Sequence, residues 1–126
     1  MSNIKSLKSV WQEGRYYDAW MFVHFLAGVC LGFGMIILKV ETFTAYLSTI
    51  VLLILWEFFE IIKKIVEHKE NRLGDIIIGT FGFIFSFSIS PIFIHNFLAP
   101  FVLCLVVFTI SCIIGWTRYF KYRKVY

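Results

Sequence analysis

The chain has 126 residues, of which 60% are hydrophobic, 20% aromatic and only 16% charged. Ordinary soluble domains contain about 25% charged residues, and a water-soluble fold of this length has too little interior to hide so much apolar surface. The composition therefore excludes a typical soluble domain and favours one membrane-embedded domain over residues 1–126. The formal charge of +4 sits mainly at the ends of apolar runs, which suits anionic lipid headgroups better than nucleic acid.

The first long apolar run follows a polar and aromatic segment, residues 1–17, which predicts a short amphipathic helix at the membrane interface. The run itself, 19–38, is about 30 Å long at 1.5 Å per residue, enough to cross the hydrocarbon core. It exceeds the apolar region of a signal peptide and lacks a following small-x-small site, which indicates an uncleaved span. His24, Gly28 and Gly32 recur every four residues and share one helix face, and the two glycines form a close-packing pattern of membrane helices.

The second span, 42–62, carries two carboxylates near its end. Glu57 and Glu60 are three residues apart and lie on one helix face. Facing lipid, each would cost roughly 2.5–3.5 kcal/mol at the helix centre, so we expect both to face protein, a wet cavity or headgroups. Glu60 has Lys64 one turn further along as a possible partner, whereas Glu57 has no basic residue three or four positions away.

The third span, 75–94, begins with an acid and continues as a stripe of small residues, which are Asp75, Gly79, Gly82, Ser86 and Ser90. Such a stripe lets helix backbones approach closely. Asp75 in a first helical turn would suit the positive end of the helix dipole, or would simply cap the helix. Pro91 is expected to end or kink the helix.

The fourth span, 97–116, holds no ionisable group other than cysteines and is interpreted as mainly structural, and residues 117–126 form a basic, aromatic tail. Eleven of the 12 Lys and Arg residues lie in 1–17, between 63 and 74, or in the tail. With four spans these three segments share one side, and the positive-inside rule places that side, with both termini, in the cytoplasm. We therefore expect an all-α, four-span, multi-pass protein of the bacterial cytoplasmic (inner) membrane.

The topology gathers five ionisable residues at one depth, and these are Asp18, His24, Glu57, Glu60 and Asp75. Intramembrane ionisable groups usually face the bundle interior and mark a pathway or site. Bland alternatives stay open: Asp18 can be interfacial, and His24 can simply hydrogen-bond a neighbouring helix. Whether these groups meet in space depends on helix rotation.

The spacing of the candidate residues along the sequence supports neither a metal site nor a catalytic nucleophile. The chain has no His-x-x-x-His or Glu-x-x-His pattern and no nucleophile elbow, so no metal or other cofactor is predicted. Cys30, Cys104 and Cys112 share no Cys-x-x-Cys spacing and are interpreted as small hydrophobes. General acid–base work by Glu57 with His24 is possible.

Several motifs in order resemble the VanZ-like family of small bacterial membrane proteins: His24-Phe25, then Trp56-Glu57-Phe58-Phe59-Glu60, then Arg72, then Asp75-x-x-x-Gly79-x-x-Gly82. The resemblance covers about residues 17–87. The chain departs from the family at Glu60, where Gln is usual, and at Ile78, where Asn is usual. The resemblance implies an envelope role linked to glycopeptide-antibiotic resistance, with recognition of a lipid or lipid-linked glycan, and it adds Arg72 to the candidate site.

The resulting hypothesis is a polar pocket at the cytoplasmic leaflet that binds a membrane amphiphile, lined by His24, Glu57, Glu60, Arg72 and Asp75. One alternative is an enzyme that uses the same residues for phosphotransfer or hydrolysis on a lipid substrate. Another is a packing subunit of a membrane complex, or a homo-oligomer, held through the helix-packing glycines. Those glycines are Gly28, Gly32, Gly79 and Gly82.

Overall fold

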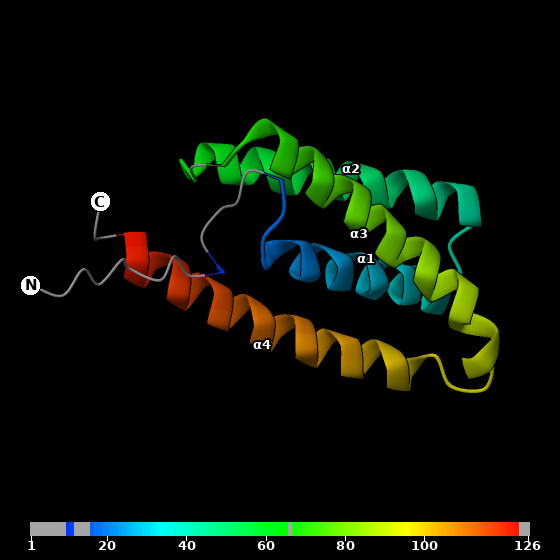
Figure 1. The fold of residues 1–126 in the computed structure, drawn as a ribbon. Helices are drawn as coiled ribbons and strands as arrows, with labels where there is room; N and C mark the ends of the chain where they lie inside the picture. Colours follow the sequence, from blue (N-terminus) through cyan, green and yellow to red (C-terminus); the bar gives the residue numbers. More distant parts are fainter. Residues whose placement is uncertain (1–9, 12–15, 66, 124–126) are drawn as a thin grey trace, which may run out of the picture.

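The computed structural model describes residues 10–11, 16–65 and 67–123, and every regular element in these ranges is helical, as predicted. In chain order the elements are α1 (Trp20–Ile37), α2 (Thr42–Ile62), α3 (Lys69–Ile89), the short 3₁₀ helix η1 (Ser90–Phe93) and α4 (Leu98–Arg123). The helices run roughly alongside one another (Figure 1). The start of α1, the α2–α3 connection and the end of α4 lie together at one end of the bundle, which we call the polar end.

All four α-helices are long and apolar enough to cross a membrane. Their outward faces carry large apolar side chains that the described parts of the chain leave exposed, among them Phe43, Val51, Leu55, Phe58, Leu103, Ile110 and Ile113. Soluble monomers rarely expose apolar patches of this extent, whereas lipid tails solvate them without cost. The structure thus has the build of a multi-pass membrane protein, and the predicted spans are confirmed as apolar helices of spanning length.

Two tight turns bound α2. Lys39, with φ of 54°, takes the left-handed conformation that reverses the chain after α1. Glu41 then caps α2, because its carboxylate accepts from the Phe43 and Thr44 amides at 2.9 and 2.8 Å. These hydrogen bonds hold the pKa of Glu41 below its usual range. At the other end Lys64, with φ of 57°, turns the chain away from the helix axis two residues after α2 ends at Ile62.

The core of the bundle is the contact between α1 and α3, and it depends on residues without side chains. The four predicted packing glycines line this contact: Gly28, Gly32, Gly79 and Gly82. A Cβ on Gly28 would collide with the Gly79 carbonyl group, and one on Gly82 would collide with the backbone of Phe25. Because α3 of the same chain fills this face, a partner helix would have to dock elsewhere.

The polar end is closed by an aromatic layer that extends α4 beyond its predicted span. Trp20 is 2% exposed and packs against Trp116 at a ring-centroid distance of 5.0 Å. Tyr119 is buried in the same cluster as Trp20, together with Val23 and Ile65. The predicted tail, 117–126, is therefore helical as far as Arg123, and its first turn packs on the bundle instead of serving only as a headgroup anchor.

The main correction to the predicted elements is the start of α3. The third span was expected to begin at Asp75, but α3 already begins at Lys69 with His68 as its N-cap. Asp75 thus lies in the second turn, and the capping interpretation of this residue is wrong. Pro91 lies in η1, just after α3 ends, as predicted. The amphipathic helix predicted for 1–17 falls mostly outside the described residues.

Candidate functional site

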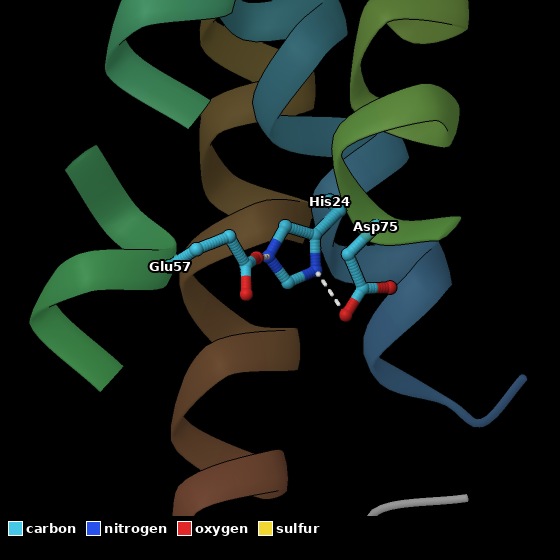
Figure 2. Close-up of side chains that lie close together, drawn as sticks. All are labelled: His24, Glu57 and Asp75. Atoms are coloured by element: carbon cyan, nitrogen blue, oxygen red, sulfur yellow. Dashed lines mark ion pairs between the residues drawn. The ribbon is translucent and has the colours of Figure 1, made fainter. Parts of the chain in front are cut away.

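Three ionisable side chains from three different helices converge at the polar end (Figure 2). His24 of α1 lies between Glu57 of α2 and Asp75 of α3. Its Nε2 is 3.2 Å from Glu57 Oε1, and its Nδ1 is 3.6 Å from Asp75 Oδ2. The three residues are only 4%, 4% and 1% exposed. We call these three residues the buried triad.

The backbone of α1 fixes the orientation of the imidazole. His24 Nδ1 is 2.9 Å from the carbonyl oxygen of Trp20, one turn earlier in the helix. A carbonyl can only accept, so Nδ1 carries the hydrogen and donates it. Nε2 consequently faces Glu57. The two side chains either share one hydrogen or form an ion pair.

Glu57 is the least satisfied member of the buried triad. Neither of its carboxylate oxygens has an aligned hydrogen bond, although His24 and Arg72 lie at ion-pair distance. Arg72 Nε is 3.7 Å from Glu57 Oε2. A buried carboxylate without hydrogen bonds costs about 1–3 kcal/mol or more. Because native structures rarely accept this cost, we look for a functional reason for it.

A second group of polar side chains joins the buried triad to the surface of the polar end. Arg72 Nε is 3.1 Å from Glu67 Oε2, and the Asn71 amide donates to Glu67 at 3.0 Å and to Asp18 at 2.8 Å. Burial, with the nearby charge of Glu57 adding to it, raises the pKa of Glu67. This network ties the start of α3 to the α2–α3 connection and to the segment before α1.

Glu60 lies beside this network and not in the buried triad. It is 3% exposed and accepts a hydrogen bond from Trp56 Nε1 at 3.0 Å. Among the described residues no ion pair joins it to Lys64, because the left-handed turn at Lys64 carries that side chain into the exposed part of the chain. The predicted alternative of a Glu60–Lys64 surface pair is therefore wrong.

An apolar groove of about 480 Å³ opens beside the buried triad, between α1, α2 and α4. His24 and Trp56 lie at its polar end, and Leu38 and Phe101 line it towards the opposite end. Its other walls are Val23, Ala27, Cys30, Leu31, Gly34, Met35, Leu52, Leu53, Leu105 and Phe108. The fourth span thus forms one wall of a cavity, which its lack of charge did not suggest.

A second hollow, of about 630 Å³, lies between α2 and α3 at the end of the bundle opposite the polar end. It is larger but more open, and Glu41, Tyr46 and Phe87 are among its lining residues. None of the buried triad contacts it. We therefore assign the candidate site to the groove that His24 lines.

The structure brings the five predicted site residues into one region, with His24, Glu57 and Asp75 in direct contact and Arg72 against Glu57. Sequence reasoning missed Glu67 and Asn71. Asn71 lies one helical turn before Asp75, so extending the stripe of Asp75 and Gly79 backwards by four residues would have found it. Glu67 lies in a connection without periodicity, where no signal was available.

Cys30 and Cys104 also meet, although their separation in the sequence gives no hint of it. Cys30 Sγ is 3.2 Å from Cys104 Sγ, across the contact between α1 and α4. Both are free thiols, and Cys112 is a third. Cys30 lines the groove, and Cys112 packs against the cluster of Trp20 and Tyr119.

Comparison of the chain with protein-family models, with curated proteins and with solved structures finds no match. The likeness to the VanZ-like family accordingly rests on the motifs alone.

Proposed function

We propose that this protein binds a lipid or lipid-linked envelope amphiphile in the bacterial cytoplasmic membrane, with the apolar tail in the groove and the polar head at His24 and Glu57. The observation that carries this proposal is the position of the groove. It is apolar along its length and meets the buried triad at one end only. A ligand that fits both parts must itself have an apolar and a polar end.

The size of the groove agrees with this class of ligand. Its volume of about 480 Å³ falls within the range of roughly 300–1,000 Å³ that small-molecule sites occupy. From His24 to Leu38 the groove follows 14 residues of α1, or about 21 Å at 1.5 Å per residue. One leaflet of the hydrocarbon core is about 15 Å thick, so the groove is long enough for an acyl or prenyl chain that spans one leaflet.

The proposed orientation places the polar end in the cytoplasm, because nearly all basic residues lie at that end. The VanZ-like resemblance supports an envelope amphiphile as the ligand. The orientation is tested with single cysteines in a background that lacks the three native ones. An impermeant thiol reagent added outside spheroplasts should label Glu41→Cys and spare Glu70→Cys, and the reverse pattern would overturn the assignment.

The ligand is tested by native mass spectrometry after gentle extraction. Wild type should carry a stoichiometric lipid, and this lipid should be lost from Glu57→Gln but kept by Glu70→Gln, which makes the same chemical change at an exposed site. Ala27→Phe, which fills the groove, should also lose it, whereas Ala99→Phe on an exposed face should not. Absence of a specific lipid from folded wild type, or equal loss in test and control variants, would refute the proposal.

The close approach of His24 Nε2 to Glu57 Oε1 supports one alternative, an acid–base enzyme acting on the head of the same amphiphile. The Trp20 carbonyl holds Nδ1 protonated, which leaves Nε2 and Glu57 to exchange a proton with a substrate. Under this alternative Glu57→Gln abolishes turnover of the extracted lipid while binding persists. Loss of the lipid itself would favour the binding role.

A further inference from the structure

We infer that the buried triad is a binding site for one divalent transition-metal ion. Each member offers one ligand atom, an imidazole nitrogen or a carboxylate oxygen, and these atoms all lie within 4.8 Å of one another. The inference concerns these three side chains alone and does not rest on the proposed amphiphile.

The spacing of the donor atoms suits a shared metal ion. Zinc binds histidine nitrogen and carboxylate oxygen at about 2.0–2.2 Å, so two such ligands on one ion lie roughly 3–3.4 Å apart. His24 Nε2 and Glu57 Oε1 are separated by 3.2 Å. Asp75 comes from a third helix and lies on the Nδ1 side of the ring, with its Oδ2 3.6 Å from that nitrogen, so its carboxylate has to turn towards Nε2 to join the same ion.

The hydrogen-bond and ion-pair partners of the buried triad are also of the kind that usually orient metal ligands. Ligating histidines generally donate their other ring N–H to a carbonyl or carboxylate, which fixes the tautomer. His24 does this through Nδ1 to the Trp20 carbonyl, leaving Nε2 for an ion. Arg72 faces Glu57 Oε2, which leaves Oε1 turned towards His24.

An independent observation is the set of buried polar atoms that lack hydrogen bonds. Within the described residues these include His24 Nε2, both Glu57 oxygens and Asp75 Oδ1. Their residues are all at least nine-tenths buried. Atoms of this kind are normally satisfied, and a bound cation would satisfy oxygens and nitrogen together.

The charges balance when a divalent ion is present. A neutral imidazole with two carboxylates and one divalent cation sums to zero, while Arg72 neutralises Glu67, which lies 3.1 Å from its Nε. Without a cation, two carboxylates would share a buried site with a single histidine, an arrangement that carries a large desolvation penalty.

A neighbouring set of carboxylates, Glu57, Glu60 and Glu67, is a weaker candidate. Their oxygens also lie within 4.8 Å of one another. However, the guanidinium of Arg72 already contacts Glu67 and Glu57, and Glu60 accepts from Trp56. This set also offers no imidazole nitrogen, and Glu67 lies closer to Arg72 than Glu57 does, so we place the metal in the buried triad.

The donor set selects the kind of ion. One nitrogen and two oxygens suit Zn²⁺, Mn²⁺ or Fe²⁺, whereas Ca²⁺ takes six to eight oxygens and Mg²⁺ prefers oxygen and water. Three protein ligands leave coordination positions open, as in catalytic metal sites. Because His24 also lines the groove, a molecule bound there could reach these positions.

The test uses the full-length, untagged chain in detergent, stripped with a chelator and then equilibrated with ZnSO₄. We expect about one zinc per chain by elemental mass spectrometry, with little Mg²⁺ retained under the same conditions. Asp75→Asn should bind zinc at least about tenfold more weakly, since losing even a supporting group of a metal ligand costs 10–100-fold. Glu70→Gln and His95→Ala, both at exposed positions, should bind as wild type does.

Visible absorption of wild type loaded with Co²⁺ provides a readout that needs no variant. Bands from nitrogen and oxygen ligands at one equivalent, displaced by zinc, would support the site even if Asp75→Asn fails to fold. Folded wild type that retains no zinc and gives no such bands would overturn the inference. So would zinc binding that is lost equally in Asp75→Asn and His95→Ala, because the metal would then sit at surface histidines.

Discussion

Replacing Gly28 with alanine is the sharpest test of the packing between α1 and α3. The added Cβ would meet the Gly79 carbonyl group and lie 2.8 Å from its carbon and 2.9 Å from the Phe83 nitrogen. Ordinary contact begins at 3.4 Å, so the helices would have to separate by at least 0.6 Å, the difference between 3.4 and 2.8 Å. The obstacles are backbone atoms, which cannot rotate away.

Gly34→Ala on the same helix is the matched control, because its Cβ would lie 3.5 Å from Phe101, in ordinary contact. Both changes gain the same helix propensity, up to about 1 kcal/mol, so the difference between the two variants isolates the steric cost. Overpacking typically costs about 1–3 kcal/mol. At roughly 3–5 °C per kcal/mol for a chain of this size, Gly28→Ala should unfold about 3–15 °C below Gly34→Ala.

The assay is thermal unfolding followed by circular dichroism in one detergent, with both variants monodisperse. Unfolding midpoints that agree within error would refute the close approach of the two backbones. A lower midpoint for Gly34→Ala would refute it as well, since the structure leaves room at that position.

Two further predictions concern charged groups. Arg72→Gln leaves Glu57 and Glu67 without their guanidinium and should destabilise the bundle by about 3–5 kcal/mol, the cost of breaking a buried pair, whereas Arg118→Gln at an exposed position should change the unfolding midpoint little. Equal effects would contradict this. Glu41→Ala should lower the midpoint at neutral pH through loss of the α2 cap. Because hydrogen bonding lowers the pKa of Glu41 in the folded state, its contribution is present above the ordinary glutamate pKa and lost as the pH falls through the folded value. The gap between wild type and variant should therefore close in acid, and a gap independent of pH would argue against the cap.

Hydropathy and small-residue stripes were enough to predict four apolar helices and the glycine face of α1, because both signals depend on the period of the helix. The start of α3 could not be predicted in this way. Asn71 and Arg72 look like loop residues by polarity, yet Asn71 donates a hydrogen bond to Asp18 and Arg72 donates one to Glu67. Local sequence does not record such long-range partners.

The candidate site shows the same limit. Glu57 stood out because its own helix offers it no basic partner, and the structure does place it against His24 and Arg72. The topology placed Asp75 at the same depth as His24 and Glu57, but their direct contact could not be predicted, since it depends on helix rotation and the three residues are 33 and 18 positions apart. Spacing rules for metal sites apply to ligands on one helix, so they do not bear on the proposed metal site, whose ligands would come from three helices.

The dominance of the α1–α3 contact has a consequence for the order in which the bundle is made. His24 and Glu57 leave the ribosome before Arg72, which follows Glu57 by 15 residues, or about 1–3 s at 5–20 residues per second. During that interval α1 lacks the helix that covers its glycine face, and Glu57 lacks its arginine. Release of α1 and α2 into lipid one at a time would strand these groups in hydrocarbon. In a membrane, holding the first two helices together until the third arrives would avoid leaving Glu57 in lipid without Arg72.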